Sequence, residues 1–118
     1  MIRLTFPREL RLLTPQDFNY VFQNSIRAGS PYITLVVRKN HFSFPRLGFA
    51  IAKKQVKRAH ERNRIKRIAR EYFRHNQDKL SGIDFILMAR HAVIELDNQK
   101  LTAILDKLCQ QIIVQKIK

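Results

Sequence analysis

The 118 residues of this chain predict a single α+β domain in which helices pack on a mixed sheet. Length is the first observation behind this prediction, because a chain of this size fits one domain with a modest core. Composition is the second, since apolar residues make up 45% of the chain and exclude a disordered protein. The third is the order of periodic segments: a helix, a group of strands, a helix, a strand and a last helix.

The N-terminal region predicts a basic arm followed by a helix. Residues 1–13 are expected to form an extended arm that carries several arginines. A capping Thr14, Pro15 in the first turn and Asp17 three residues after the cap predict a helix that runs to about Asn24. Its apolar side carries three residues at helical spacing: Phe18, Val21 and Phe22.

Two strands joined as a hairpin are expected next. Residues 25–30 predict irregular chain or a short edge strand. Tyr32–Arg38 is rich in β-branched residues, and Arg46–Ala52 follows after a turn, so we expect these two strands to pair with each other. Alternation puts Ile33, Leu35 and Val37 on one face of the first strand, and Tyr32, Thr34, Val36 and Arg38 on the other.

The second half of the chain predicts a basic helix, a buried strand and a final helix. The basic helix is expected from Ala59 to a point near residues 79–82. Asp84–Arg90 is an almost continuous apolar run, which is typical of a strand buried on both faces. From Asn98 to about Gln115 an amphipathic helix is expected, with an inner side of Leu101, Ile104, Leu105, Leu108 and Ile112.

Positive charge is concentrated in Lys53–Arg74, which holds ten basic residues against two acidic ones. The whole chain has a formal net charge of +14 and a pI near 10.8. Such a charge implies an acidic partner, and nucleic acid is the leading candidate, ahead of an anionic membrane surface. Six arginines elsewhere can extend a positive surface: Arg8, Arg11, Arg27, Arg38, Arg46 and Arg90.

The basic segment is periodic, which indicates an ordered helix with two unlike faces. An apolar stripe is formed by Ile65, Ile68, Ala69, Tyr72 and Phe73. The opposite arc carries Arg62, Asn63, Lys66, Arg67, Arg70 and Arg74. Solvated helix faces usually mix acidic and basic side chains, and one sign predominates here, so contact with nucleic acid is favoured over simple solvation.

No catalytic or metal-binding set is predicted in the protein. The nine acidic residues, Asp84 among them, are scattered, most of them at helix or strand ends, where capping and solubility explain them. The four histidines lack ligand spacing, and the single Cys109 is expected to be a small core residue in a reducing cytosol. Neither a signal peptide nor a membrane helix is expected, so we predict a cytoplasmic protein.

Phe18 and Phe22 have two interpretations that the sequence leaves open. They lie one helical turn apart, and core packing explains them simply. Alternatively, the helix lies beside an open sheet face and its aromatic rings stack on the bases of an unpaired strand, with Tyr32 in a similar role.

The run from Ala52 through Lys53, Lys54, Ala59 and Arg62-Asn63-Arg64-Ile65-Lys66-Arg67 to Arg70 resembles the RNR signature of the bacterial ribonuclease P protein subunit. Phe6–Leu12 is similar to the form typical of proteobacterial members, and the resemblance covers essentially the whole chain. Two departures stand out. The chain has Lys57-Arg58-Ala59 where many members have Gly-Asn-Ala, and Val36 where some members have an aromatic residue.

The resemblance implies an αβββαβα domain whose RNR helix lies in a left-handed crossover, against the usual right-handed rule. It implies an endoribonuclease holoenzyme that removes the 5′ leader of precursor tRNA. A catalytic RNA carries the chemistry and its magnesium ions, the protein alone is inactive, and no further protein partner is implied. The RNR residues that meet the catalytic RNA would be Lys53, Lys54, Arg62, Asn63, Arg64, Lys66, Arg67 and Arg70. The leader would lie in a cleft between the first helix and the sheet, at Arg11, Phe18, Phe22, Tyr32 and Val36.

Three other functions remain as alternatives. The first is a basic RNA-binding protein of another ribonucleoprotein, similar to a ribosomal protein, that uses the same helix as a phosphate anchor. A protein nuclease acting alone is disfavoured, because it needs clustered carboxylates to hold magnesium. A helix-turn-helix DNA-binding protein is disfavoured, because no short helix precedes the basic one at the required turn.

Overall fold

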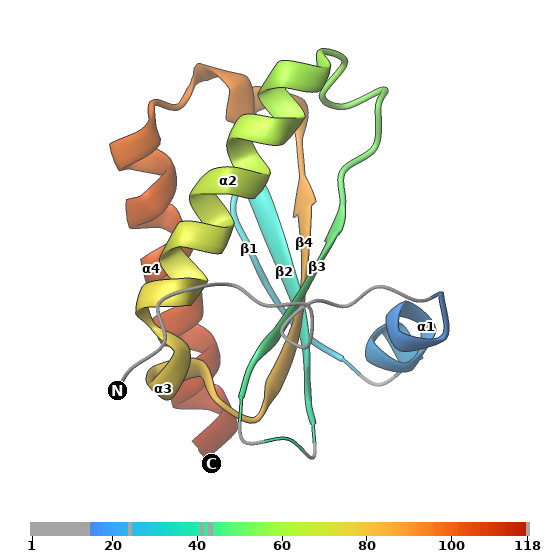
Figure 1. Ribbon diagram of the computed structural model, residues 1–118, viewed down its shortest axis with the longest axis vertical. Helices are drawn as coiled ribbons and strands as arrows, with labels where there is room; N and C mark the ends of the chain where they lie inside the picture. Colours follow the sequence, from blue (N-terminus) through green and yellow to red (C-terminus); the bar gives the residue numbers. More distant parts are fainter. Residues whose placement is uncertain (1–14, 24, 41, 43, 118) are drawn as a thin grey trace.

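A mixed sheet of four strands separates two helical layers (Figure 1). The computed structural model describes residues 15–23, 25–40, 42 and 44–117. Its elements are, in order, α1 (Pro15–Gln23), β1 (Ile26–Gly29), β2 (Ile33–Lys39), β3 (Arg46–Ala50), α2 (Ala59–His75), α3 (Gln77–Leu80), β4 (Ile83–Ala89), the 3-10 helix η2 (His91–Glu95) and α4 (Asn98–Ile117). This order confirms the predicted α+β pattern and adds the short helices α3 and η2. The expected arm of residues 1–13 and the expected cap Thr14 lie outside the described residues.

The strand order is β1-β2-β4-β3, so the predicted hairpin between the second and third strands is wrong. β4 lies between them, antiparallel to β2 and parallel to β3. The reason lies in β4 itself, where six of the seven residues are buried. A strand that is apolar on both faces is best placed in the centre of a sheet with helices on either side. The prediction that this strand is buried on both faces is confirmed.

The basic helix α2 connects the parallel strands β3 and β4, so these three elements form a βαβ crossover. Its left hand remains the expectation that the family resemblance carries. α2 ends at His75, earlier than expected, and α3 continues the path after Asn76. Gly82 then turns the chain into β4 with a φ of 78°, a left-handed conformation that glycine adopts without a steric cost.

The main core lies between the sheet and the layer of α2 and α4 (Figure 1). The predicted stripe of α2 is buried there in full, with Ile65, Ile68, Ala69, Tyr72 and Phe73 all inaccessible or nearly so. β2 contributes Ile33, Leu35 and Val37 to the same core, as its alternation predicts. Because α2 packs through this stripe, its opposite face is held toward the outside.

A second and smaller cluster lies on the other face of the sheet, under α1. Val21 of α1, Val36 of β2 and Ile86 of β4 are fully buried in it. α1 is thus the single helix on this face among the described residues (Figure 1). The nine residues of α1 cover only part of a four-stranded face, and no other helix of the described residues lies on it.

Candidate nucleic-acid interfaces

The outer face of α2 and the turn before it form the first candidate interface. Lys53, Lys54, Asn63 and Arg67 are exposed there. The other four members of the predicted RNR set are half-buried: Arg62, Arg64, Lys66 and Arg70. The eight residues therefore divide into side chains that are open to a partner and side chains that also contact the protein.

Arg62 supports the chain that leads into α2. Its Nη1 donates hydrogen bonds to the carbonyl oxygens of Val56 at 2.9 Å and Lys57 at 2.8 Å. Val56 is buried, so this arginine holds the connection between β3 and α2 against the body of the protein. Arg62 therefore has a structural role in addition to any contact with nucleic acid.

Arg64 points toward the start of α4. Its Nη1 donates to Oδ1 of Asn98 at 3.0 Å, and its Nε lies 3.3 Å from Oε1 of Glu61. The side chain is 18% exposed. Arg64 thus links α2 to α4 and offers less of its charge to an outside ligand than Arg67 does.

Arginines one turn apart on α2 line a shallow hollow of about 330 Å³, formed by Arg67, Arg70, Glu71 and Arg74. The guanidinium carbon of Arg70 lies 5.4 Å from the ring centre of Phe49 on β3, close enough for a cation–π contact. Arg74, which the resemblance did not single out, is ion-paired with Glu71. Planar guanidinium groups in such a row suit the oxygens of a phosphate backbone.

The second candidate interface is the sheet face beside α1. Phe18, Phe22, Ala50 and Met88 are half-buried and pack against the small cluster of Val21, Val36 and Ile86. Phe18 and Phe22 therefore combine the two interpretations that the sequence left open. Part of each side chain packs on the protein, and part remains accessible at the edge of the helix.

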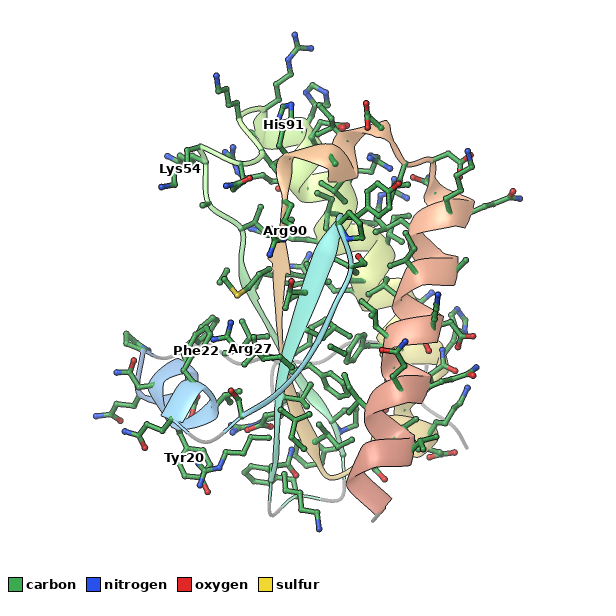
Figure 2. The ribbon with its side chains drawn as sticks, turned by 180° about the vertical axis from the view of Figure 1, so that it is seen from behind. Tyr20, Phe22, Arg27, Lys54, Arg90 and His91 are labelled. Carbon is green, nitrogen blue, oxygen red and sulfur yellow. The ribbon has the colours of Figure 1, made fainter. Side chains whose placement is uncertain are left out.

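The uncovered part of this face is one cross-strand row of small or flexible side chains. β-sheet register aligns Gly29, Thr34, Met88 and Ala50, which we call the open strip. Each of these residues is exposed or half-buried. Arg27, in register with Val36 on the same face, and Arg90, which follows β4, are exposed cations near this strip. Figure 2 labels both, together with Phe22, in a view that has α1 on one side of the strands and α4 on the other. An unpaired nucleic-acid strand needs such a combination of accessible rings and flanking cations.

The structure corrects two residues of the expected leader cleft. Tyr32 packs against the main core, on the side of Ile33 and not of Val36. Alternation does not apply to it, because β2 begins at Ile33 and the Ser30 hydroxyl accepts hydrogen bonds from the amides of Tyr32 and Ile33 in the preceding turn. Val36 does lie on the α1 face, but it is completely buried under the helix and offers no surface to a ligand. Arg11 lies outside the described residues.

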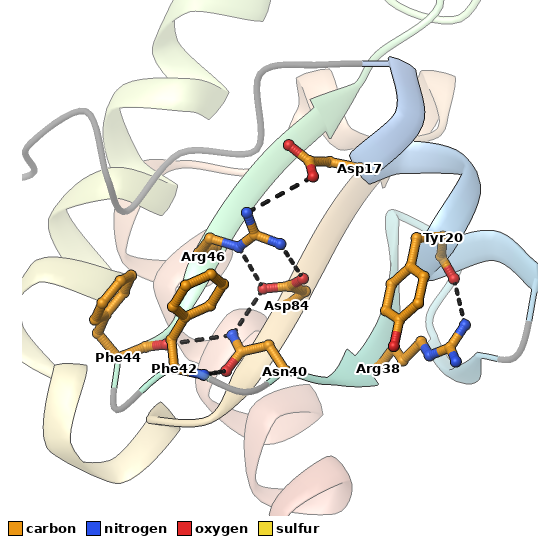
Figure 3. Close-up of polar contacts among 8 residues, drawn as sticks. All are labelled: Asp17, Tyr20, Arg38, Asn40, Phe42, Phe44, Arg46 and Asp84. Atoms are coloured by element: carbon orange, nitrogen blue, oxygen red, sulfur yellow. Dashed lines mark hydrogen bonds and ion pairs between the residues drawn. The ribbon is translucent and has the colours of Figure 1, made fainter.

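A polar network that the sequence analysis missed anchors α1 at the far end of the sheet (Figure 3). Asp84, fully buried, accepts hydrogen bonds from Arg46 and Asn40. The hydrogen bond that Arg46 donates to Asp84 raises the pKa of the Arg46 guanidinium. The signal in the sequence that could have revealed this network is Asp84 itself, because a carboxylate in a buried apolar strand requires a hydrogen-bonding partner.

Two contacts connect this end of the sheet to α1. Arg46 lies 3.7 Å from Oδ1 of Asp17. The Nη1 of Arg38 donates a 2.7 Å hydrogen bond to the carbonyl oxygen of Tyr20. The guanidinium carbon of Arg38 lies 3.7 Å from the centre of the Tyr20 ring, which is a cation–π contact. Arg38 and Arg46 are therefore structural residues here, whereas Arg27 and Arg90 remain available to extend the positive surface.

The part of the chain that the structure describes contains no group of three or more histidine, cysteine or acidic residues that could hold a metal ion. Cys109 is fully buried, which fits the prediction of a core residue. Within the same residues, no helix combines the length and the apolar character required to span a membrane.

Comparison with known proteins shows the family to which this chain is similar. The sequence model of the ribonuclease P family matches residues 6–113. The ribonuclease P protein component of Proteus mirabilis is 59% identical over 108 residues, which cover 92% of this chain and 91% of that protein. The corresponding protein of Photorhabdus laumondii is 60% identical over 108 residues, with the same coverage of 92% and 91%.

Solved structures agree in fold. A mutant of the Staphylococcus aureus RNase P protein aligns with a TM-score of 0.83 and 23% identity over 89% of both chains. The RNase P protein of Thermotoga maritima aligns with a TM-score of 0.71 and 28% identity, over 85% of this chain and 96% of that one. The resemblance found in the sequence is thereby confirmed.

Proposed function

The chain belongs to the bacterial ribonuclease P protein family, and we propose on this premise that it binds two RNA segments at once: the catalytic RNA on α2 and the 5′ leader of precursor tRNA beside α1. The role in maturation of the tRNA 5′ end follows from the family. The assignment of one RNA segment to each surface is our proposal. We also propose that the protein acts in the cytoplasm.

The arrangement of α2 is the single observation that carries the first half of the proposal. Its apolar stripe is buried in the main core, and this fixes which side chains face outward. Asn63, Arg67 and the two lysines at residues 53 and 54 are exposed on the outward side. A rigid row of cations with a fixed spacing can follow a phosphate backbone at low entropic cost.

The open strip supports the second half. Its floor carries small or flexible side chains and no aromatic ring, so bases of an unpaired strand can approach the sheet. Phe18 and Phe22 provide accessible aromatic edges on one side, and Arg27 and Arg90 provide charge. A mature tRNA has no leader to place here, so this surface would distinguish substrate from product.

The protein does not supply the chemistry in this proposal. Among the described residues there is no carboxylate cluster that could hold magnesium, so the proposal includes no metal-assisted step on the protein. The proposal assigns catalysis and magnesium binding to the RNA subunit. The protein contributes by holding the leader and by anchoring itself on the RNA.

Cleavage of precursor tRNA in magnesium buffer, with and without the catalytic RNA, tests the proposal. We expect no cleavage by protein freed of RNA, and at low magnesium we expect faster cleavage by the catalytic RNA when the protein is added. The double variant Asn63→Ala, Arg67→Ala should bind the catalytic RNA more weakly. Cleavage that co-purifies with the RNA-free protein would refute the division of labour. Unchanged binding of the double variant would instead favour an RNA anchor elsewhere.

A further inference from the structure

A cavity of about 290 Å³ lies between the first turn of α2 and η2, beyond both surfaces described above. It is lined by Lys57, Arg58, His60, Glu61, His91 and Ile94. None of these belongs to the RNR set or to the sheet face with Phe18, Phe22 and the open strip, which we call the leader surface after its proposed ligand. Its volume lies near the lower end of the range for ligand sites, which suits a single nucleotide unit and not a protein segment.

The cavity is positively charged even with both histidines neutral. Lys57 and Arg58 are exposed, and within the described residues their side chains make no hydrogen bond or ion pair. Glu61 is the only acidic residue of the lining, and Arg64 holds its carboxylate at 3.3 Å. The two free cations therefore determine the sign of the ligand that this cavity accepts.

His91 lies at the wall of the cavity, where Gln55 contacts both its ring and its backbone amide. Its Nδ1 lies 3.2 Å from the carbonyl oxygen of Gln55, and its amide donates to Oε1 of Gln55 at 3.1 Å. A carbonyl oxygen only accepts, so Nδ1 carries the proton of the neutral ring and Nε2 is left as an acceptor. Nε2 makes no hydrogen bond to any residue that the structure describes. Figure 2 shows His91 at the same end of the molecule as Lys54.

Ile94 adds an apolar surface to this cationic cavity. The side chain is 40% exposed, so part of its apolar surface is open to a ligand in the cavity. Cations, an acceptor and an apolar contact are the groups that would meet the phosphate, the 2′-hydroxyl and the sugar or base of a ribonucleotide.

We propose that this cavity binds one nucleotide of the catalytic RNA, with Lys57 and Arg58 on its phosphates, Ile94 against its sugar or base and His91 Nε2 accepting from its 2′-hydroxyl. This rests on the proposed function, since it extends the anchor on α2 by one site. The catalytic RNA is the occupant rather than the leader, because residues 57, 58 and 60 lie directly before the exposed RNR residue Asn63.

The test compares two double variants that remove the same charge. The cavity variant, Lys57→Ala with Arg58→Ala, removes the two free cations of the cavity lining. The α4 variant, Lys100→Ala with Lys107→Ala, removes two exposed cations of α4. Binding to the catalytic RNA alone is measured over a range of salt concentrations. The cavity variant should lose roughly tenfold in affinity per phosphate contact. The slope of log K against log salt should become shallower by about 1.4 to 1.8. The α4 variant should match the unmodified protein in slope.

A third variant, Ile94→Ser, keeps the charge and should weaken binding several-fold without a change of slope. The inference is overturned if the cavity variant behaves like the α4 variant. It is also overturned if the cavity variant loses only its preference for precursor over mature tRNA, because the cavity would then serve the leader. If Asn63→Ala with Arg67→Ala also leaves RNA binding unchanged, the proposed function fails; if only the cavity variants are silent, that function stands.

Discussion

Arg46 of β3 donates two hydrogen bonds to Asp84 of β4, from Nε to Oδ1 at 2.9 Å and from Nη2 to Oδ2 at 2.7 Å. The two residues are register partners in the parallel pairing that the sequence analysis missed. Arg46 also lies 3.7 Å from Asp17, so the pair connects the sheet to α1. The helix that borders the leader surface is therefore held in part by a buried ion pair between two strands.

Removal of the carboxylate should destabilise the protein strongly. In Asp84→Ala, Arg46 keeps the longer contact to Asp17 and its cation–π contact with the Phe42 ring, but it loses both hydrogen bonds to a carboxylate while its side chain is only 17% exposed. Breaking a buried pair in this way typically costs about 3–5 kcal/mol, and urea denaturation measures it. Glu95→Ala, which removes an exposed carboxylate on η2, is the matched control and should change stability by less than about 0.5 kcal/mol. Equal costs for the two variants would show that the pair does not hold the sheet.

The basic helix shows how much of the fold could be predicted from the sequence. The spacing of Ile65, Ile68 and Ala69 repeats with the helix period, and a periodic pattern fixes which side of a helix is buried. In the same way, the alternation of Ile33, Leu35 and Val37 predicts which face of β2 lies on the main core. Both predictions concern neighbours along the chain, and both are confirmed.

The errors concern residues far apart along the chain. Two strands separated by a turn were expected to pair, but pattern alone does not show that β4 inserts between them. The sequence pattern places Asp84 at a strand end and does not reveal its partner Arg46, because the two residues are 38 positions apart. At the leader surface, Thr34, Met88 and Ala50 come together only through that same strand order, so the open strip could not be predicted.

Two arginines of the predicted RNR set should respond differently to substitution. Arg67 is exposed, so Arg67→Ala should weaken RNA binding and leave the melting temperature nearly unchanged. Arg62 also binds the carbonyl oxygens of Val56 and Lys57, so Arg62→Ala should lose about 1–2 kcal/mol of stability as well. Thermal melting beside RNA titration measures both quantities. Identical melting curves for the two variants would mean that the contacts of Arg62 are dispensable.

Alkaline pH should weaken the contact between α2 and α4. Burial raises the pKa of the Cys109 thiol to about 12, and burial also raises the pKa of Tyr72, whose hydroxyl donates to Asp106. A raised pKa means that the folded state keeps a proton that the unfolded state has already released. Stability is therefore complete below about pH 9 and falls as the pH rises toward 12.

Urea denaturation between pH 7.5 and 10.5 measures this loss, which can reach about 1.4 kcal/mol per pH unit for each retained proton. Cys109→Ala removes one of the two groups, so its free energy of unfolding should fall less steeply with pH, whatever its value at neutral pH. An unchanged slope in this variant would show that the thiol does not contribute.

The leader surface yields the most specific expectation, because two adjacent residues of α1 differ in exposure. Val21 is completely buried, whereas Phe22 is half-buried at the edge of the open strip. Stacking of one base on an aromatic ring contributes about 1–3 kcal/mol. Phe22→Ala should therefore weaken binding of leader-bearing precursor to the holoenzyme by about 5- to 150-fold and leave mature tRNA binding unchanged. Phe18→Ala should act in the same direction, at a cost in stability below the 3–5 kcal/mol of a fully buried phenylalanine.

Val21→Ala is the matched control, because it loosens the same helix without removing an accessible ring. It should lower the melting temperature and affect the two RNAs equally. If Phe22→Ala also affects precursor and mature tRNA equally while it remains folded, the ring does not contact the leader. If Val21→Ala instead reproduces the selective loss, the position of α1 discriminates the substrates, and base stacking does not.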